Sequence, residues 1–178
     1  MADIPMNKIT SNLSKTKLLV LTALLFAVAL VLSVVENSLP TISLPVPGIK
    51  LGLSNIVVMY ALFFLGKKQA FIIAILKALF VVITRGPIAG LLSLCGGILS
   101  LVVMSLLILI FKDKISYFVL SIFGSISHNV GQFIVISFIY TNMYLWFYLP
   151  FLLIAGVIAG MATSTLLRFI LPAFKRLV

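Results

Sequence analysis

A lysine, Lys77, falls in the middle of a membrane-length apolar run, in a chain of 178 residues with only 13 basic and 3 acidic side chains. On insertion scales an ionisable group at the centre of a membrane helix costs about 2.5–3.5 kcal/mol, so it marks a functional site by default. A buried ammonium suits the recognition of an anionic or carbonyl-rich ligand. The structural alternative is a side chain that snorkels to the interface or becomes neutral on burial.

A second polar feature is a stripe of side chains at 4-3-4 spacing in the fifth apolar segment. It consists of Ser121, Ser125, His128 and Gln132. Side chains at this spacing share one face of a helix, and a polar face must meet protein or water rather than lipid. The stripe, with Asn129 beside it, could contact a ligand, or it could form an interhelical hydrogen-bond network that holds the bundle together.

The remaining candidates lie nearer the predicted outer face. The full set of candidate ligand-binding residues is Glu36, Asn37, Lys50, Asn55, Lys77, Arg85, His128, Asn129 and Gln132. Several also have a structural interpretation: Arg85 could anchor a helix end at the interface, and Asn55 could brace the chain where it re-enters the membrane. Glu36 could pair with Lys50 or Arg85 and never touch a ligand.

These residues must be positioned by membrane-spanning helices, because hydrophobic residues make up 63% of the chain. Hydropathy predicts an all-α integral membrane protein with six transmembrane helices of bilayer length. The predicted spans are 17–35, 51–66, 69–85, 87–111, 115–140 and 144–170. We expect residues 1–16 to form a cytoplasmic N-terminal segment and residues 17–178 a single transmembrane domain.

The orientation follows from the basic residues of the short loops. With these spans, one side of the membrane carries Lys8, Lys15, Lys17, Lys67, Lys68, Lys112, Lys114, Arg168, Lys175 and Arg176. The other side carries only Lys50 and Arg85, and the positive-inside rule therefore makes the first side cytoplasmic. We expect a multi-pass protein of a bacterial cell membrane with both termini in the cytoplasm.

The connection over residues 36–50 is predicted to lie outside. Pro40, Pro45, Pro47 and Gly48 exclude a helix across it, yet it is too apolar for a loop that is merely solvated. We expect it to fold back over the bundle as a lid; a structural plug at the helix ends is the alternative.

The predicted positions place the ionisable groups toward the outside, whereas the polar groups of the inner half are mostly hydroxyls. The polar residues therefore outline a cup that is open to the outside and closed below. Such a cup fits a binding protein better than a channel, which needs a continuous polar path. The basic residues form no continuous face for a nucleic acid. There is no GxxxxGK[ST] motif for ATP hydrolysis, and Asp3, Glu36 and Asp113 are too scattered for a metal-dependent enzyme. We expect no enzymatic activity, no cofactor and no metal, and a partner that supplies energy.

Two longer segments carry a family resemblance. Residues 47–57 read Pro-Gly-Ile-Lys-Leu-Gly-Leu-Ser-Asn-Ile-Val, and residues 127–132 read Ser-His-Asn-Val-Gly-Gln. With residues 61–66 and 92–97, they resemble the Gx transporter family, which also bears the name heptaprenyl diphosphate synthase component I. The resemblance spans most of residues 15–170.

This family looks like the substrate-binding S components of energy-coupling factor (ECF) transporters. The resemblance implies a small vitamin- or cofactor-like ligand, with an anionic flavin nucleotide as one candidate. It also implies a membrane coupling protein and a pair of ATPases as partners. Ala23 and Ala27 match the small-residue motif with which the first helix docks on the coupling protein. The alternative is a membrane accessory subunit of prenyl diphosphate or quinone biosynthesis, although the chain lacks the aspartate-rich motifs of a synthase.

Overall fold

A computed structural model describes residues 14–38, 54–140, 146, 147 and 149–175, without the side chains of residue 113 and of 168–175. These residues form six α-helices and the short 3₁₀ helix η2, and Trp146 and Phe147 are also in a 3₁₀ conformation. In chain order the helices are α1 (Lys15–Ser38), α2 (Asn55–Phe64), α3 (Lys67–Arg85), α4 (Pro87–Phe111), η2 (Lys112–Lys114), α5 (Tyr117–Ile139) and α6 (Leu149–Lys175). The described part of the chain contains no strand, and the all-α prediction is confirmed for it.

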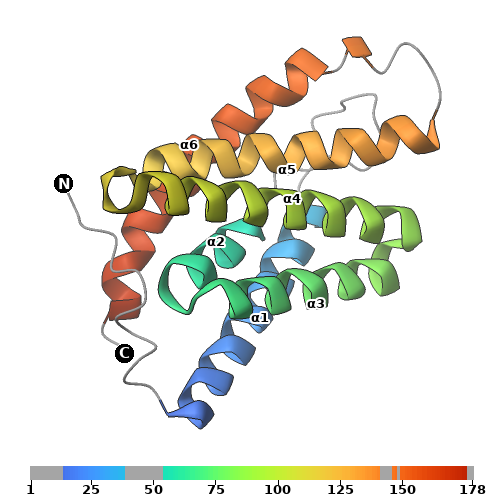
Figure 1. Cartoon of the computed structure of the whole chain (residues 1–178). Coiled ribbons are helices and arrows are strands. Elements are labelled where there is room, and N and C mark those ends of the chain that lie inside the picture. The colour runs from blue at the N-terminus through green and yellow to red at the C-terminus, as the bar shows by residue number, and fades with distance from the viewer. Residues whose placement is uncertain (1–13, 39–53, 141–145, 148, 176–178) are drawn as a thin grey trace.

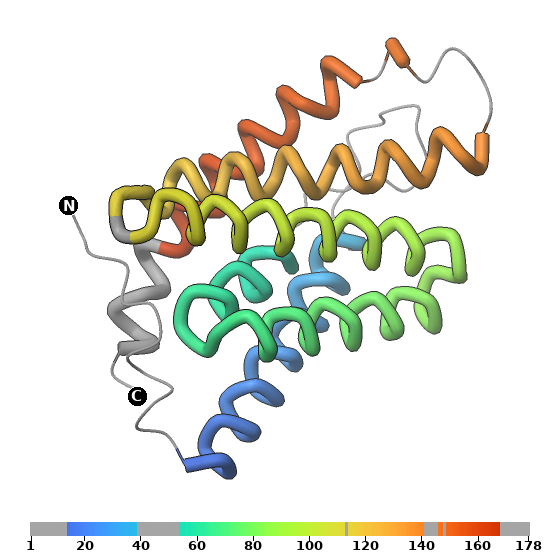
Figure 2. The backbone as a smooth tube through the Cα atoms, viewed as in Figure 1, coloured from blue at the N-terminus to red at the C-terminus, as the bar shows by residue number. Residues whose placement is uncertain are grey.

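The helices form one bundle. Figure 1 shows α3, α4 and α5 side by side with alternating direction, α6 packed on α5, and α1 crossing α2 and α3 at a steep angle. The tube in Figure 2 shows how short the connections from α2 to α5 are, and short connections favour antiparallel neighbours.

Local sequence explains these connections. Gly66 and Gly86 have φ values of +103° and +91°, a region that glycine enters without steric cost, and each begins the next helix as its N-cap. Pro87 then occupies the first position of α4, where its missing N–H is not needed. At α5 the Ser116 hydroxyl accepts a hydrogen bond from the backbone N–H of Val119 at 3.3 Å.

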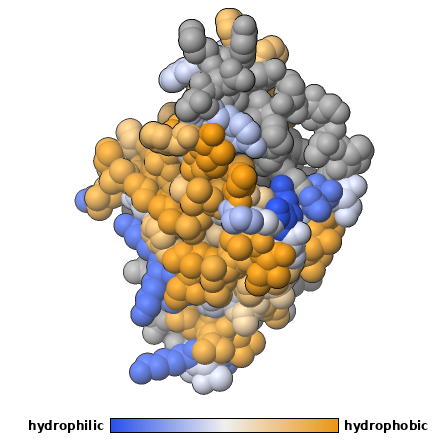
Figure 3. Space-filling model, turned by 90° about the vertical axis from the view of Figure 1, so that its right-hand side faces the viewer, coloured by the Kyte–Doolittle hydropathy of each residue, from blue (hydrophilic) through white to orange (hydrophobic). Residues whose placement is uncertain are grey.

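Four of the described helices, α1, α4, α5 and the Leu149–Leu167 part of α6, are long and apolar enough to cross a membrane. The chain is therefore a membrane-spanning protein. Its lipid-facing character is visible on α1, where Leu19 is 69% exposed and Val31 61% exposed. Figure 3 shows one face of the molecule on which apolar side chains predominate and hydrophilic ones form small patches.

The second predicted span takes a different form. Instead of a helix over 51–66, α2 has 10 residues from Asn55 to Phe64, and residues 51–53 lie outside the described part. Ten residues rise about 15 Å, roughly half of a hydrocarbon core. Helix α2 ends before the turn at Gly66, and at this length it is too short to cross a bilayer alone. The six-span arrangement and the orientation of the termini stay predictions.

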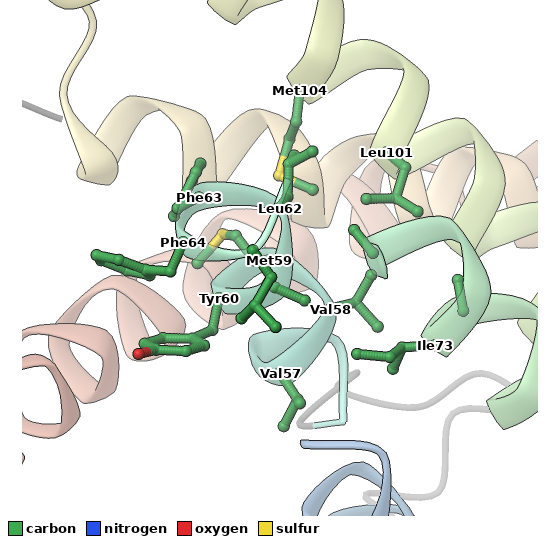
Figure 4. Packing of buried hydrophobic residues seen from close by; sticks show 14 of the residues in the cluster. Val57, Val58, Met59, Tyr60, Leu62, Phe63, Phe64, Ile73, Leu101 and Met104 are labelled. Atoms are coloured by element: carbon green, nitrogen blue, oxygen red, sulfur yellow. The ribbon is translucent and has the colours of Figure 1, made fainter. Parts of the chain in front are cut away.

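The short helix α2 is the centre of the hydrophobic core. Every residue from Ile56 to Phe64 is buried, as expected for a helix that is apolar on all sides. Figure 4 shows its side chains meeting Ile73 of α3 and Leu101 and Met104 of α4. Leu25 and Ala29 of α1 belong to the same cluster. The core therefore surrounds α2 and leaves its first residue, Asn55, at one end.

Glycines bring α4, α5 and α6 close together. A Cβ at Gly131 of α5 would lie 2.9 Å from the Cys95 carbonyl oxygen of α4, and one at Gly160 of α6 would lie 2.5 Å from Ile122 Cα of α5. Gly156 and Gly160, which lie four residues apart on α6, thus serve internal packing against α5.

Candidate ligand-binding site

Lys77 is deeply buried and contacts the first residue of α2. Its side chain is 2% exposed, and its Nζ donates a hydrogen bond to Asn55 Oδ1 at 3.0 Å. The sequence explains this meeting: Asn55 lies eleven residues before Gly66 and Lys77 eleven after it, so the two arms of the α2–α3 hairpin have equal length. Both residues are among the candidates for ligand binding, and the structure brings them into contact.

The end of α1 brings a carboxylate to the same region. Glu36 is buried, and its negative charge acts on both Lys77 and Arg85. Arg85 is the last residue of α3 and is only partly buried. Glu36 thus acts electrostatically on Arg85, one of the two partners considered from the sequence, and on Lys77 as well. Asn37, one residue further along α1, is exposed.

The polar stripe of α5 faces the interior, as predicted. His128 and Gln132 are 4% and 5% exposed, one helical turn apart. The positive charge of Lys77 acts on His128, whose imidazole lies against Gly96 of α4. Within the described part of the chain, Gln132 Oε1 is buried and makes no hydrogen bond. His128 Nδ1 is buried and makes none of regular geometry, although the Gly96 backbone is close enough to interact with the imidazole. These two atoms have the capacity to bind a further polar group.

Two other members of this region are held by the protein itself. Asn129 Nδ2 donates to the Leu152 carbonyl oxygen of α6 at 2.9 Å, which supports the interpretation of a brace between helices. Ser121 Oγ donates to the Tyr117 carbonyl oxygen at 2.7 Å, within its own helix. Some residues in and beside the stripe are thus hydrogen-bonded within the protein, whereas others have buried polar atoms that make no regular hydrogen bond.

Six of the candidates come together from four helices. We call them the polar cluster: Glu36, Asn55, Lys77, Arg85, His128 and Gln132. Each is linked to another by a hydrogen bond, an electrostatic interaction or one turn of the same helix. Lys50, and the lid predicted over 36–50 from residue 39 onward, lie outside the described residues and stay predictions.

Gly96 is the residue that sequence reasoning missed. A Cβ at this position would lie 2.8 Å from both His128 Nδ1 and the His128 backbone oxygen, so only glycine leaves room for the imidazole. The Gly96-Gly97 pair in an otherwise bulky apolar helix was the available signal, but the sequence did not indicate what it faces.

A family model described as heptaprenyl diphosphate synthase component I matches residues 25–170. The chain belongs to this family. The match includes α2 to α5 entirely and every residue of the polar cluster. Neither the curated proteins nor the solved structures include a match to the chain. Membership in the heptaprenyl diphosphate synthase component I family therefore confirms the resemblance to that family, and the relation to ECF transporters remains to be argued.

Proposed function

We propose that this chain is the substrate-binding membrane subunit of an ECF-type ABC transporter. It binds a small anionic vitamin- or cofactor-like molecule from the outer side of the cell membrane and depends on partner ATPases for energy. The observation that supports this most strongly is the polar cluster, because four helices bring ionisable and amide side chains together inside an apolar bundle. Buried ionisable groups in a membrane protein typically mark a substrate site.

The distribution of the core favours binding over conduction. The apolar side chains of α2 fill the bundle from Ile56 to Phe64, directly beyond Asn55. A polar site that ends at a packed hydrophobic core is closed on one side, whereas a channel requires a continuous polar path. Transport by such a subunit requires a partner, and the sequence has no nucleotide-binding loop of its own.

The surface of α1 suits the docking of that partner. Ala23 and Ala27 are exposed on this helix, and small side chains allow another helix to approach closely. A membrane coupling protein that joins the subunit to an ATPase pair is the occupant that the transporter proposal requires.

Co-purification tests the proposal. The full-length protein, extracted from its native membrane in mild detergent, should carry a coupling membrane protein and two ATPases identified by mass spectrometry. Replacing both alanines, A23L/A27L, should abolish this association while the protein remains folded, because both positions are exposed. The matched control is Ala162→Leu, another exposed alanine on α6, which should retain the partners.

The same experiment distinguishes the transporter proposal from the accessory-subunit alternative. Association with a soluble aspartate-rich prenyl synthase, unaffected by A23L/A27L and without ATPases, would contradict the transporter function. It would instead make the chain a membrane subunit of prenyl diphosphate or quinone biosynthesis.

A further inference from the structure

Two buried polar atoms point to a ligand group that is not yet accounted for. Within the described residues, Gln132 Oε1 lacks a hydrogen bond and His128 Nδ1 lacks one of regular geometry, although both side chains are at least nine-tenths buried. Leaving a buried polar atom unpaired costs about 1–3 kcal/mol relative to hydrated or paired states, and each native case requires an explanation. Because the two residues are one turn apart on α5, a single planar group could contact both.

Lys77 supplies a charge close to these atoms. An ammonium has three N–H donors, and the one described hydrogen bond uses a single donor, for Asn55. Asn55 is the first residue of α2, where the helix dipole places partial positive charge. A lysine beside a helix N-terminus is unfavourable on its own, and an anion between them would relieve that repulsion. Both features therefore favour negative charge at the same place.

We propose that the polar cluster holds an anionic ligand by two different parts of the molecule. A negatively charged group of the ligand, such as a carboxylate, lies beside Lys77 and the start of α2. A hydrogen-bonding edge of the amide, imide or ureide type, with an N–H and a C=O, meets Gln132 and His128. This inference rests on the proposed transport function, and it narrows the ligand to anions that also carry such an amide-type edge.

The experiment uses the purified full-length protein and the deproteinised small-molecule extract of its host cells as the probe. Immobilised wild-type protein, K77M, Q132L and the control S137A are equilibrated with the extract, and retained compounds are identified by mass spectrometry. Ser137 is on the same helix, and its Oγ bonds only the Phe133 carbonyl in the described structure. Circular dichroism and gel-filtration elution confirm that each variant is folded, and Q132L serves where K77M fails to fold.

We expect wild type and S137A to retain an anion with an amide-type edge. Retention should fall at least about tenfold in K77M and in Q132L. A neutral analogue of the retained compound, such as its methyl ester, should bind wild type at least about tenfold more weakly, and K77M should bind acid and ester equally.

The alternative outcomes separate this inference from the proposed function. A retained compound that lacks either a negative charge or an amide-type edge, or a compound that K77M and Q132L retain like wild type, would overturn the inference and leave the transporter function intact. If the wild type retains no compound although it co-purifies with the ATPases, the inference fails alone. If it retains none and carries no ATPases, both fail.

Discussion

The Lys77–Asn55 hydrogen bond connects a buried charge to a helix that is otherwise entirely apolar. Lys77 has one described acceptor, and the side chain is 2% exposed, so water cannot replace that acceptor easily. The contribution of Asn55 to stability is therefore that of a hydrogen bond to a charged group, which is larger than that of a neutral pair.

Replacing Asn55 with leucine should destabilise the protein by about 1.5–3 kcal/mol, because it leaves the Lys77 ammonium buried without its acceptor. The measurement is the free energy of unfolding in mild detergent, followed by circular dichroism during SDS or thermal unfolding. The double variant K77M/N55L should recover most of the loss, because neither polar partner remains. Strictly additive losses in the two single variants and the double variant would show that the hydrogen bond does not couple them.

At the scale of the helices, α4 and α5 depend on glycine for their close approach at the polar cluster. The imidazole and backbone of His128 occupy the space in which a Gly96 side chain would lie, whereas Gly97 on the neighbouring face has only Ala74 Cβ at 3.8 Å. The two adjacent glycines of one helix thus experience very different surroundings, and they form a matched pair for mutagenesis.

Gly96→Ala should destabilise the protein by about 1–3 kcal/mol, since the methyl group forces the helices apart or tilts the imidazole. Gly97→Ala should be neutral or stabilise by up to about 1 kcal/mol, because alanine has the higher helix propensity and the contact distance is ordinary. Unfolding in mild detergent measures both. Equal effects of the two substitutions would contradict the packing described for α4 and α5.

The helices show which parts of the fold the sequence could predict. The α3–α4 boundary was recovered because Gly86 and Pro87 are strong local signals, and hydropathy identified the long apolar helices. The length of α2 was not recovered, because its end depends on Gly66, and hydropathy continues smoothly across Leu65 into that turn. Depth along each helix placed Lys77 and His128 near the midplane and Asn55 further out, but periodicity alone could not show that α4 contributes Gly96.

The two ends of the helix bundle differ in the exposed residues that they carry, and this difference bears on how the molecule is oriented in the membrane. The first turn of α3 and the 3₁₀ helix η2 after α4 carry exposed basic residues, Lys68 and Lys114. The opposite ends of the bundle carry Arg85 and the exposed aromatic side chain Trp146. Basic loops remain in the cytoplasm and aromatic side chains prefer the interface, so this arrangement predicts that the polar cluster opens outward.

Cysteine accessibility in intact cells tests this orientation. The native Cys95 is first replaced by alanine, and single cysteines are then introduced at Lys68, Lys114 or Trp146, which are all exposed. A membrane-impermeant maleimide should label W146C in intact cells, whereas K68C and K114C should react only after the membrane is permeabilised. The reverse pattern would place the start of α2, and with it Lys77, toward the cytoplasm. In that case the site would load from inside, and uptake by a subunit that captures its ligand outside would be excluded.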